Sequence, residues 1–156
     1  MASGAKTEIL RHSSYSLYRG HFSPDERWVT FHADDPQRGT RVFIAPFRGP
    51  VAVDESDWIA ITDGKAFDDA PRWSPDGNLL YYFSDQDGSR CIWAQPLEPA
   101  SKKPLGAPFG VQHLHSRQHS VSAVSLNRLD LFVVHDKIVF TMGELRGNIW
   151  MAELRE

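Results

Sequence analysis

The chain has 156 residues, a formal net charge of −3 and one cysteine, Cys91. This slightly acidic balance gives no electrostatic basis for binding nucleic acid or an anionic membrane, and a single cysteine excludes an intrachain disulfide. No apolar stretch approaches the roughly 20 residues that span a bilayer, and residues 1–6 lack the apolar core of a secretory signal. As written, the chain is expected to be cytoplasmic, although no motif fixes the compartment.

A short motif occurs twice in the chain, about fifty residues apart. Phe22-Ser23-Pro24-Asp25 returns as Trp73-Ser74-Pro75-Asp76, and each copy is followed by an apolar run, a polar loop and a second apolar run. Helical periodicity is almost absent, whereas short apolar runs bounded by Pro, Gly, Asp and Ser are typical of strands. A repeat of this length built from short strands predicts an all-β fold made of β-propeller blades, each with four antiparallel strands.

About three such blades are expected in chain order, which amounts to half a propeller. The first blade covers 15–62, the second 63–118 and the third 119–156, and the third is incomplete because it lacks an outer strand. A short strand at 7–10, within an N-terminal tail of residues 1–14, has the length and character of that missing strand. The expected strands are 18–22, 28–33, 41–47 and 57–62 in the first blade; 71–74, 79–84, 90–97 and 110–115 in the second; 129–134, 138–142 and 147–154 in the third.

The turn that follows each motif has a physical basis. In Ser74-Pro75-Asp76-Gly77 the proline presets φ for a type I turn, the aspartate accepts from nearby N–H groups, and the glycine suits a left-handed conformation. The first blade has Glu26 in place of this glycine, which costs about 1 kcal/mol if φ stays positive. In the third blade only Asp136 of the motif remains. Asp87-Gly88 is the clearest hairpin signal.

The apolar runs are continuous, as in 79–83 and 138–140, and do not alternate with polar residues. A sheet with one wet face should alternate, whereas blades stacked around an axis bury both faces. Trp93 and Trp150, at corresponding strand ends, are therefore expected to be buried between blades. Replacing either by alanine would then cost about 3–5 kcal/mol.

The units resemble the TolB-type, WD-repeat-like β-propeller repeats of bacteria. The resemblance lies in Phe22-Ser23-Pro24-Asp25, in 70–77 and in the strand ends Cys91-Ile92-Trp93 and Asn148-Ile149-Trp150. The third unit looks like the closing blade of propellers appended to bacterial protein kinases and transcriptional regulators. The resemblance implies a blade type and specifies no activity.

Closure of the ring is the open question for three blades, because a propeller typically has about 4–8. Three outcomes are possible: a piece of a longer polypeptide that supplies neighbouring blades, an open wedge, or a six-bladed ring formed with a second copy. For the chain alone the homodimer is favoured, with residues 7–10 of each copy completing the last blade of the other.

The best metal-like cluster in the sequence is His113-x-His115, with His119 nearby. Residues i and i+2 of a strand face the same side, so the two imidazoles could share a zinc or copper ion. A polar strand whose histidines form hydrogen bonds is the simpler interpretation, and no metal is assigned. Asp85-Gln86-Asp87-Gly88 is interpreted as a hairpin turn because the distal ligands of a calcium loop are missing.

No catalytic residue and no cofactor are expected. The sequence has neither a Gly-x-Ser-x-Gly motif nor a glycine-rich phosphate loop. Loop solvation is the interpretation for the paired aspartates at 34–35 and 68–69. Five arginines in or beside loops could line one rim of the ring, or simply balance nearby acids: Arg38, Arg41, Arg72, Arg90 and Arg146.

The expected function is therefore that of a non-catalytic scaffold or protein-interaction segment. The alternative is a small-molecule or metal-binding propeller that uses its axial channel or rim loops, with His113 and His115 as ligands.

Overall fold

The computed structural model describes residues 4, 6–37, 39–116, 119–144 and 146–152. These residues form an all-β structure of four antiparallel sheets with two to four strands each. The described residues contain no α-helix and three short 3-10 helices, Glu55–Asp57, Val121–Ala123 and Leu126–Arg128. The prediction of an all-β fold is confirmed.

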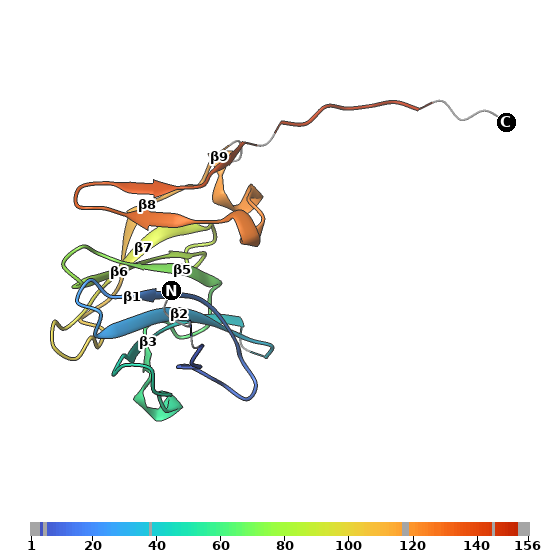
Figure 1. Cartoon of the computed structure of the whole chain (residues 1–156). Helices are drawn as coiled ribbons and strands as arrows, with labels where there is room; N and C mark the ends of the chain where they lie inside the picture. Colours follow the sequence, from blue (N-terminus) through green and yellow to red (C-terminus); the bar gives the residue numbers. More distant parts are fainter. Residues whose placement is uncertain (1–3, 5, 38, 117–118, 145, 153–156) are drawn as a thin grey trace.

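Two four-stranded sheets make up the body of the molecule, each with its strands side by side in chain order. The first sheet consists of β1 (Ser16–Phe22), β2 (Trp28–Asp35), β3 (Gly39–Pro46) and β4 (Ile59–Ala60). The second consists of β5 (Asp68–Trp73), β6 (Leu79–Ser84), β7 (Cys91–Pro96) and β8 (Phe109–Gln112). In Figure 1 the second sheet lies above the first, and the orange-red C-terminal part lies above both.

The C-terminal part is smaller. β10 (Leu131–Val133) and β11 (Ile138–Phe140) form a hairpin, and β9 (His119–Ser120) pairs with β12 (Gly143–Glu144). The strands expected at 129–134 and 138–142 are thus present but shorter. β11 pairs only with β10 in the described part of the chain, so its other edge carries no strand.

The repeated motif folds the same way in both large sheets. In each copy the serine hydroxyl donates to the aspartate, from Ser23 to Asp25 at 2.6 Å and from Ser74 to Asp76 at 2.5 Å. The same serine oxygen accepts the N–H of the first residue of the next strand, Trp28 or Leu79. These bonds fix the turn between the first two strands, as the sequence predicted.

Both sheets also share an irregularity that the sequence did not indicate. The register of the first strand shifts between Tyr18 and His21, and again between Asp69 and Arg72. Arg19 and Ala70, three residues before the aromatic residue of each motif, have φ of 55° and 52°. The first strands of the two sheets therefore share a β-bulge at an equivalent position relative to the motif.

The turns lead to a stability prediction. Glu26 has φ of 56° and Gly77, its counterpart, has φ of 70°. An L side chain is disfavoured there, so Glu26→Gly should stabilise the protein by about 1 kcal/mol, measured by urea denaturation. Gly77→Ala is the matched control and should destabilise it. A Glu26→Gly variant less stable than wild type would mean that the left-handed geometry is not retained.

Both faces of the large sheets are covered by apolar side chains. Between the two sheets, Val42 and Ile44 of β3 meet Trp73, Leu80 and Tyr82 of the second sheet. On its other face, the second sheet packs against the C-terminal part through a separate buried cluster: Ala70, Phe83, Ile92, Val121, Leu129 and Leu131. This double burial explains the continuous apolar run 79–83, but the expected burial of both faces is wrong for the run 138–140, where Val139 is 59% exposed.

The outer face of the first sheet is covered by its own chain. Phe31 and Phe43 are packed by Trp58 with ring centroids 4.9 Å and 5.7 Å apart, and Leu10 and Tyr15 also cover this face. The expected strand at 7–10 is absent in the structure. Instead, the carbonyl of Ile9 accepts the N–H of Val53 at 2.9 Å. The segment 7–10 packs on the first sheet of the same chain, because this removes the apolar outer face of that sheet from water.

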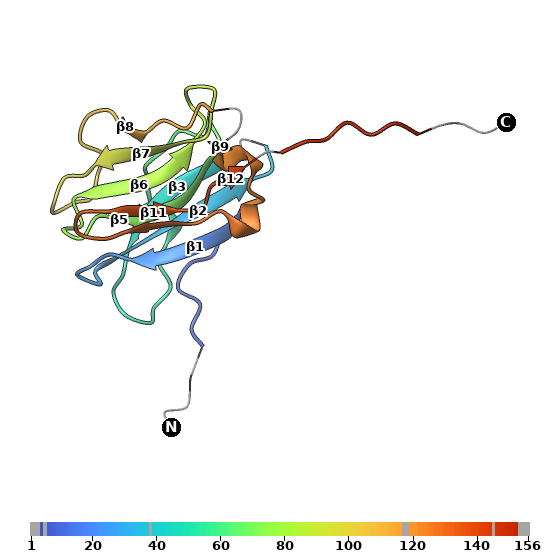
Figure 2. The ribbon, with the colours of Figure 1, turned by 90° about the horizontal axis from the view of Figure 1, so that it is seen from above.

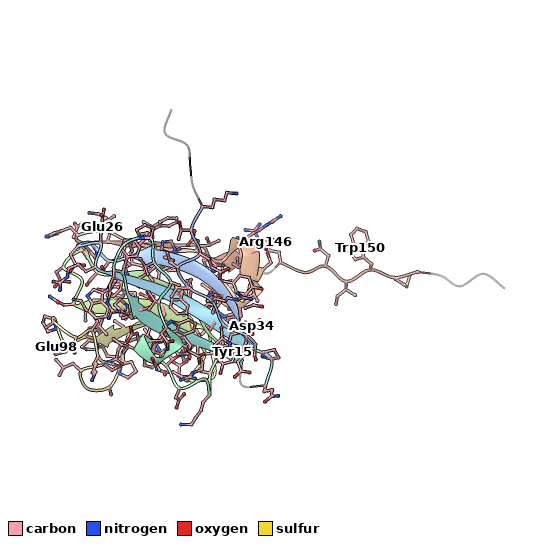
Figure 3. All side chains as sticks on the ribbon, turned by 60° about the horizontal axis from the view of Figure 1, so that its bottom comes forward. Tyr15, Glu26, Asp34, Glu98, Arg146 and Trp150 are labelled. Carbon is pink, nitrogen blue, oxygen red and sulfur yellow. The ribbon has the colours of Figure 1, made fainter. Side chains whose placement is uncertain are left out.

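The predicted last strand, 147–154, is also corrected. The described part of it, 147–152, has no strand, and Figures 1 and 2 show it leaving the body as an extended segment. Trp150 is 88% exposed (Figure 3), so its expected burial is wrong for this chain alone. Trp93 is half-buried and packs at the edge of the cluster between the sheets. Residues 153–154 lie outside the described part.

Candidate functional site

The two histidines singled out by the sequence lie at the end of β8, the outer strand of the second sheet. β8 pairs with β7, and the pairing ends at Ile92 and Gln112. His113 and His115 then flank Leu114, whose side chain packs against the cluster shared by the second sheet and the C-terminal part. Because alternate residues of an extended segment face opposite sides, anchoring Leu114 turns both imidazoles to the same side.

A carboxylate and a thiol meet these imidazoles. His113 Nδ1 lies 3.0 Å and His115 Nε2 3.1 Å from the same carboxylate oxygen of Asp87. Cys91, the first residue of β7, is fully buried, and its Sγ accepts the N–H of Leu114 at 3.3 Å. The ligand atoms of these four residues all lie within 4.8 Å of one another.

Local structure sets the place of each group. Asp87 lies in the β6–β7 turn, which the N–H of Gly88 closes onto the carbonyl of Asp85 at 2.8 Å, with Gly88 at φ of 89°. The hairpin interpretation of 85–88 is therefore confirmed. β7 begins directly after this turn and pairs antiparallel with β8. The start of β7, and with it the turn, therefore lies beside the end of β8.

The pKa values of Cys91 and Asp87 are shifted in opposite directions. Burial raises the pKa of the Cys91 thiol, and nearby Asp87 adds to this, against the N–H of Leu114. Burial also acts to raise the pKa of Asp87, but the N–H of Ser89 and both imidazoles outweigh it and lower the pKa. The carboxylate is thus charged at neutral pH and holds both histidines.

The members of this cluster differ from the histidines that the sequence indicated. His119 belongs to β9 and is no member of the cluster, while Asp87 and Cys91 are members that sequence reasoning missed. They were missed because they stand 22–28 residues before the histidines, a separation that only the β7–β8 pairing reveals. The cluster lies beside the outer strand of its sheet, at the edge opposite β5.

A second group of charged side chains lies where the two sheets and the C-terminal part meet. Asp69 of β5 is 2% exposed, and one of its oxygens lies 3.2 Å from Arg19 Nε and 2.8 Å from His32 Nδ1. Burial alone would raise the pKa of Asp69, but His32, Arg19 and the N–H of Ala70 hold it below its usual value. Arg19 also donates to the carbonyl of Leu126.

This network continues into the C-terminal part. Arg72 of β5 donates to Asp130, which also accepts the N–H of Leu131 at 2.9 Å and lies 4.0 Å from Arg19. A pocket of about 500 Å³ opens beside the network and is lined by residues of all three parts, Tyr18, Asp34, Phe67 and Leu126 among them. Its lining combines charged and apolar groups, which suits a small ligand.

The paired aspartates lie in strands and not in loops, which corrects the interpretation from the sequence, and three of the four are buried: Asp35, Asp68 and Asp69. Asp34 is exposed. Asp34 and Asp35 end β2, and Asp68 and Asp69 begin β5. Asp68 is 2% exposed, its N–H donates to the Thr40 hydroxyl at 2.7 Å, and burial raises its pKa to about 6. The local pattern of apolar and polar residues does not distinguish the three buried aspartates from loop residues.

The predicted arginine rim does not form as one surface. Arg41 and Arg90 lie over aromatic rings, 4.8 Å from Phe43 and 4.5 Å from Phe67, and Arg72 belongs to the buried network. Arg146 pairs with Glu144 at 2.9 Å on the surface, as charge balance suggested. Arg38 lies outside the described residues.

No protein-family model matches the chain, and its sequence matches none of the curated proteins significantly. The class of the protein therefore comes from the fold alone: it is an all-β protein with four antiparallel sheets, two of which have four strands.

The described part of the chain has no helix that is both long and apolar enough to cross a membrane.

Proposed function

We propose that this chain is a non-catalytic β-propeller segment that serves as a scaffold and binds a second copy of itself through its C-terminal part. One observation carries the proposal: among the residues that the structure describes, β11 has an edge without a partner strand, and the extended apolar segment 147–152 pairs with no strand. The stacked four-strand sheets, with a turn and a bulge repeated at equivalent positions, support blades of a propeller.

The face of the β10–β11 hairpin supports an interaction at this end. Phe132 and Val139 are directly paired across the hairpin and are 56% and 59% exposed, and Val134 and Met142, next to the two strands in the chain, are also exposed. Exposed apolar side chains grouped in this way can mark a binding surface. The edge of β11 beside it offers unpaired backbone groups to an added strand.

The extended segment 147–152 supports a second copy as the occupant. Ile149, Trp150 and Met151 are almost fully exposed, and the segment points away from the body (Figure 3). It has the sequence predicted for the third strand of the last unit. In a two-fold pair, each segment would add to β11 of the other copy, and both contacts form at once. This role replaces the one expected for 7–10, which packs on its own first unit.

The test is the mass of the full chain in solution by light scattering after gel filtration. Wild type should have about twice the 17.7 kDa of one chain. The double variant Ile149→Asp, Trp150→Asp should have the mass of one chain and an unchanged circular dichroism spectrum, because both side chains are almost fully exposed. A matched control, Val51→Asp with Leu105→Asp, alters exposed apolar residues elsewhere and should keep the wild-type mass.

Wild type that stays at 17.7 kDa at high protein concentration would overturn self-association. So would a double variant that retains the doubled mass.

A further inference from the structure

We propose that Asp87, Cys91, His113 and His115 bind one Zn²⁺ ion at the outer edge of the second sheet. The four groups supply one thiolate, two imidazoles and one carboxylate, which is a complete tetrahedral set for zinc. This inference is independent of the proposed self-association.

The geometry is close to that of a zinc site. With metal–ligand distances of about 2.0–2.3 Å, neighbouring ligand atoms of a tetrahedral site lie about 3.5 Å apart. In this structure all four ligand atoms lie within 4.8 Å of one another. Small rotations of the exposed imidazoles are therefore sufficient to bring the set around one ion.

The fold fixes one ligand, Cys91, and the backbone between the two histidines. Cys91 is fully buried and held in β7, and the chain at Leu114 is tied to its sulfur by a backbone N–H. A soft thiolate with imidazoles selects zinc over calcium or magnesium, which require oxygen ligands. The carboxylate of Asp87 already contacts both imidazoles, so a zinc ion would replace these two contacts with stronger bonds.

The consequence is a clamp within the second sheet. Zinc would tie the β6–β7 turn and the start of β7 to the chain that leaves β8 for the C-terminal part. Since all four ligands come from the protein, the site would be structural, without an open position for substrate.

The experiment is a Co²⁺ titration of the reduced, untagged full chain, followed by displacement with Zn²⁺. We expect one Co²⁺ per chain, intense visible bands typical of tetrahedral coordination, a thiolate charge-transfer band in the near ultraviolet, and loss of both on adding Zn²⁺. His115→Gln and Asp87→Asn change exposed side chains, so the fold should survive. Each should weaken Zn²⁺ binding by more than about 100-fold, because loss of even an outer-shell partner costs about 10- to 100-fold.

His119→Gln is the matched control: it removes an exposed histidine four residues away that is no member of the cluster, and binding should be unchanged. Cys91→Ala should remove the charge-transfer band, and thermal unfolding in the absence of metal checks that this buried variant folds. The proposal is overturned if Co²⁺ gives only the weak bands of octahedral coordination. It is equally overturned if His119→Gln weakens binding as much as His115→Gln.

Discussion

Phe83→Ala should reduce the free energy of unfolding by about 3–5 kcal/mol, the range for a buried aromatic residue cut back to alanine. Phe83 of β6 is fully buried and belongs to the cluster between the second sheet and the C-terminal part. Removing the ring leaves a cavity where the second sheet packs against the C-terminal part. The C-terminal part should therefore be the first to lose its packing. Urea denaturation followed by circular dichroism measures the change.

Leu105→Ala is the control for this prediction. Leu105 is 59% exposed and should cost less than about 0.5 kcal/mol when replaced. If Phe83→Ala were as mild as this control, the contact between the second sheet and the C-terminal part would contribute little to stability. The order of loss can be followed by hydrogen exchange, in which the amides of β10 and β11 should lose protection before those of β2 and β3.

Asp68→Asn should gain stability relative to wild type as the pH rises from about 4 to 7. Burial raises the pKa of Asp68 to about 6 from 3.8, with Asp85 and Asp63 adding to the shift and the Ser84 and Thr62 hydroxyls opposing it. The folded state therefore holds its proton more tightly than the unfolded state does. The stability this provides is fully present below the unfolded pKa and is lost as the pH passes through about 6.

Because asparagine does not ionise, the variant escapes this loss, which amounts to at most about 3 kcal/mol for a shift from 3.8 to about 6. Urea denaturation of both proteins at several pH values gives the difference directly. Asp76→Asn should show the opposite trend, since the Ser74 hydroxyl and the N–H of Asn78 lower the pKa of Asp76. A constant difference between Asp68→Asn and wild type across this range would contradict the prediction.

The repeat made much of the fold predictable. Two copies of one motif located the turns, and the continuous apolar runs predicted sheets that bury both faces. The sequence failed where contacts between distant segments decide the structure. Residues 7–10 and 147–152 have the composition of strands, but strand formation needs a free edge at the right place, and local sequence does not specify edges.

The candidate sites show the same limit. His113 and His115 were visible because alternate residues of an extended segment share a side. Their partners, Asp87 and Cys91, depend on the pairing of β7 with β8, so no local pattern could indicate them. Asp69, Arg19 and His32 come from three strands of two sheets, and their meeting depends on how those sheets stack.

The two ends of this stack are not alike, and the difference bears on how large an assembly can become. Trp58 and the chain around Leu10 seal the first sheet, whereas the last hairpin presents bare apolar side chains. Repetitive proteins need such terminal covers to prevent endless addition of subunits. If two molecules join through their bare ends, as proposed, only the covered ends remain outside. Such an assembly would stop at a pair and would not continue into a filament.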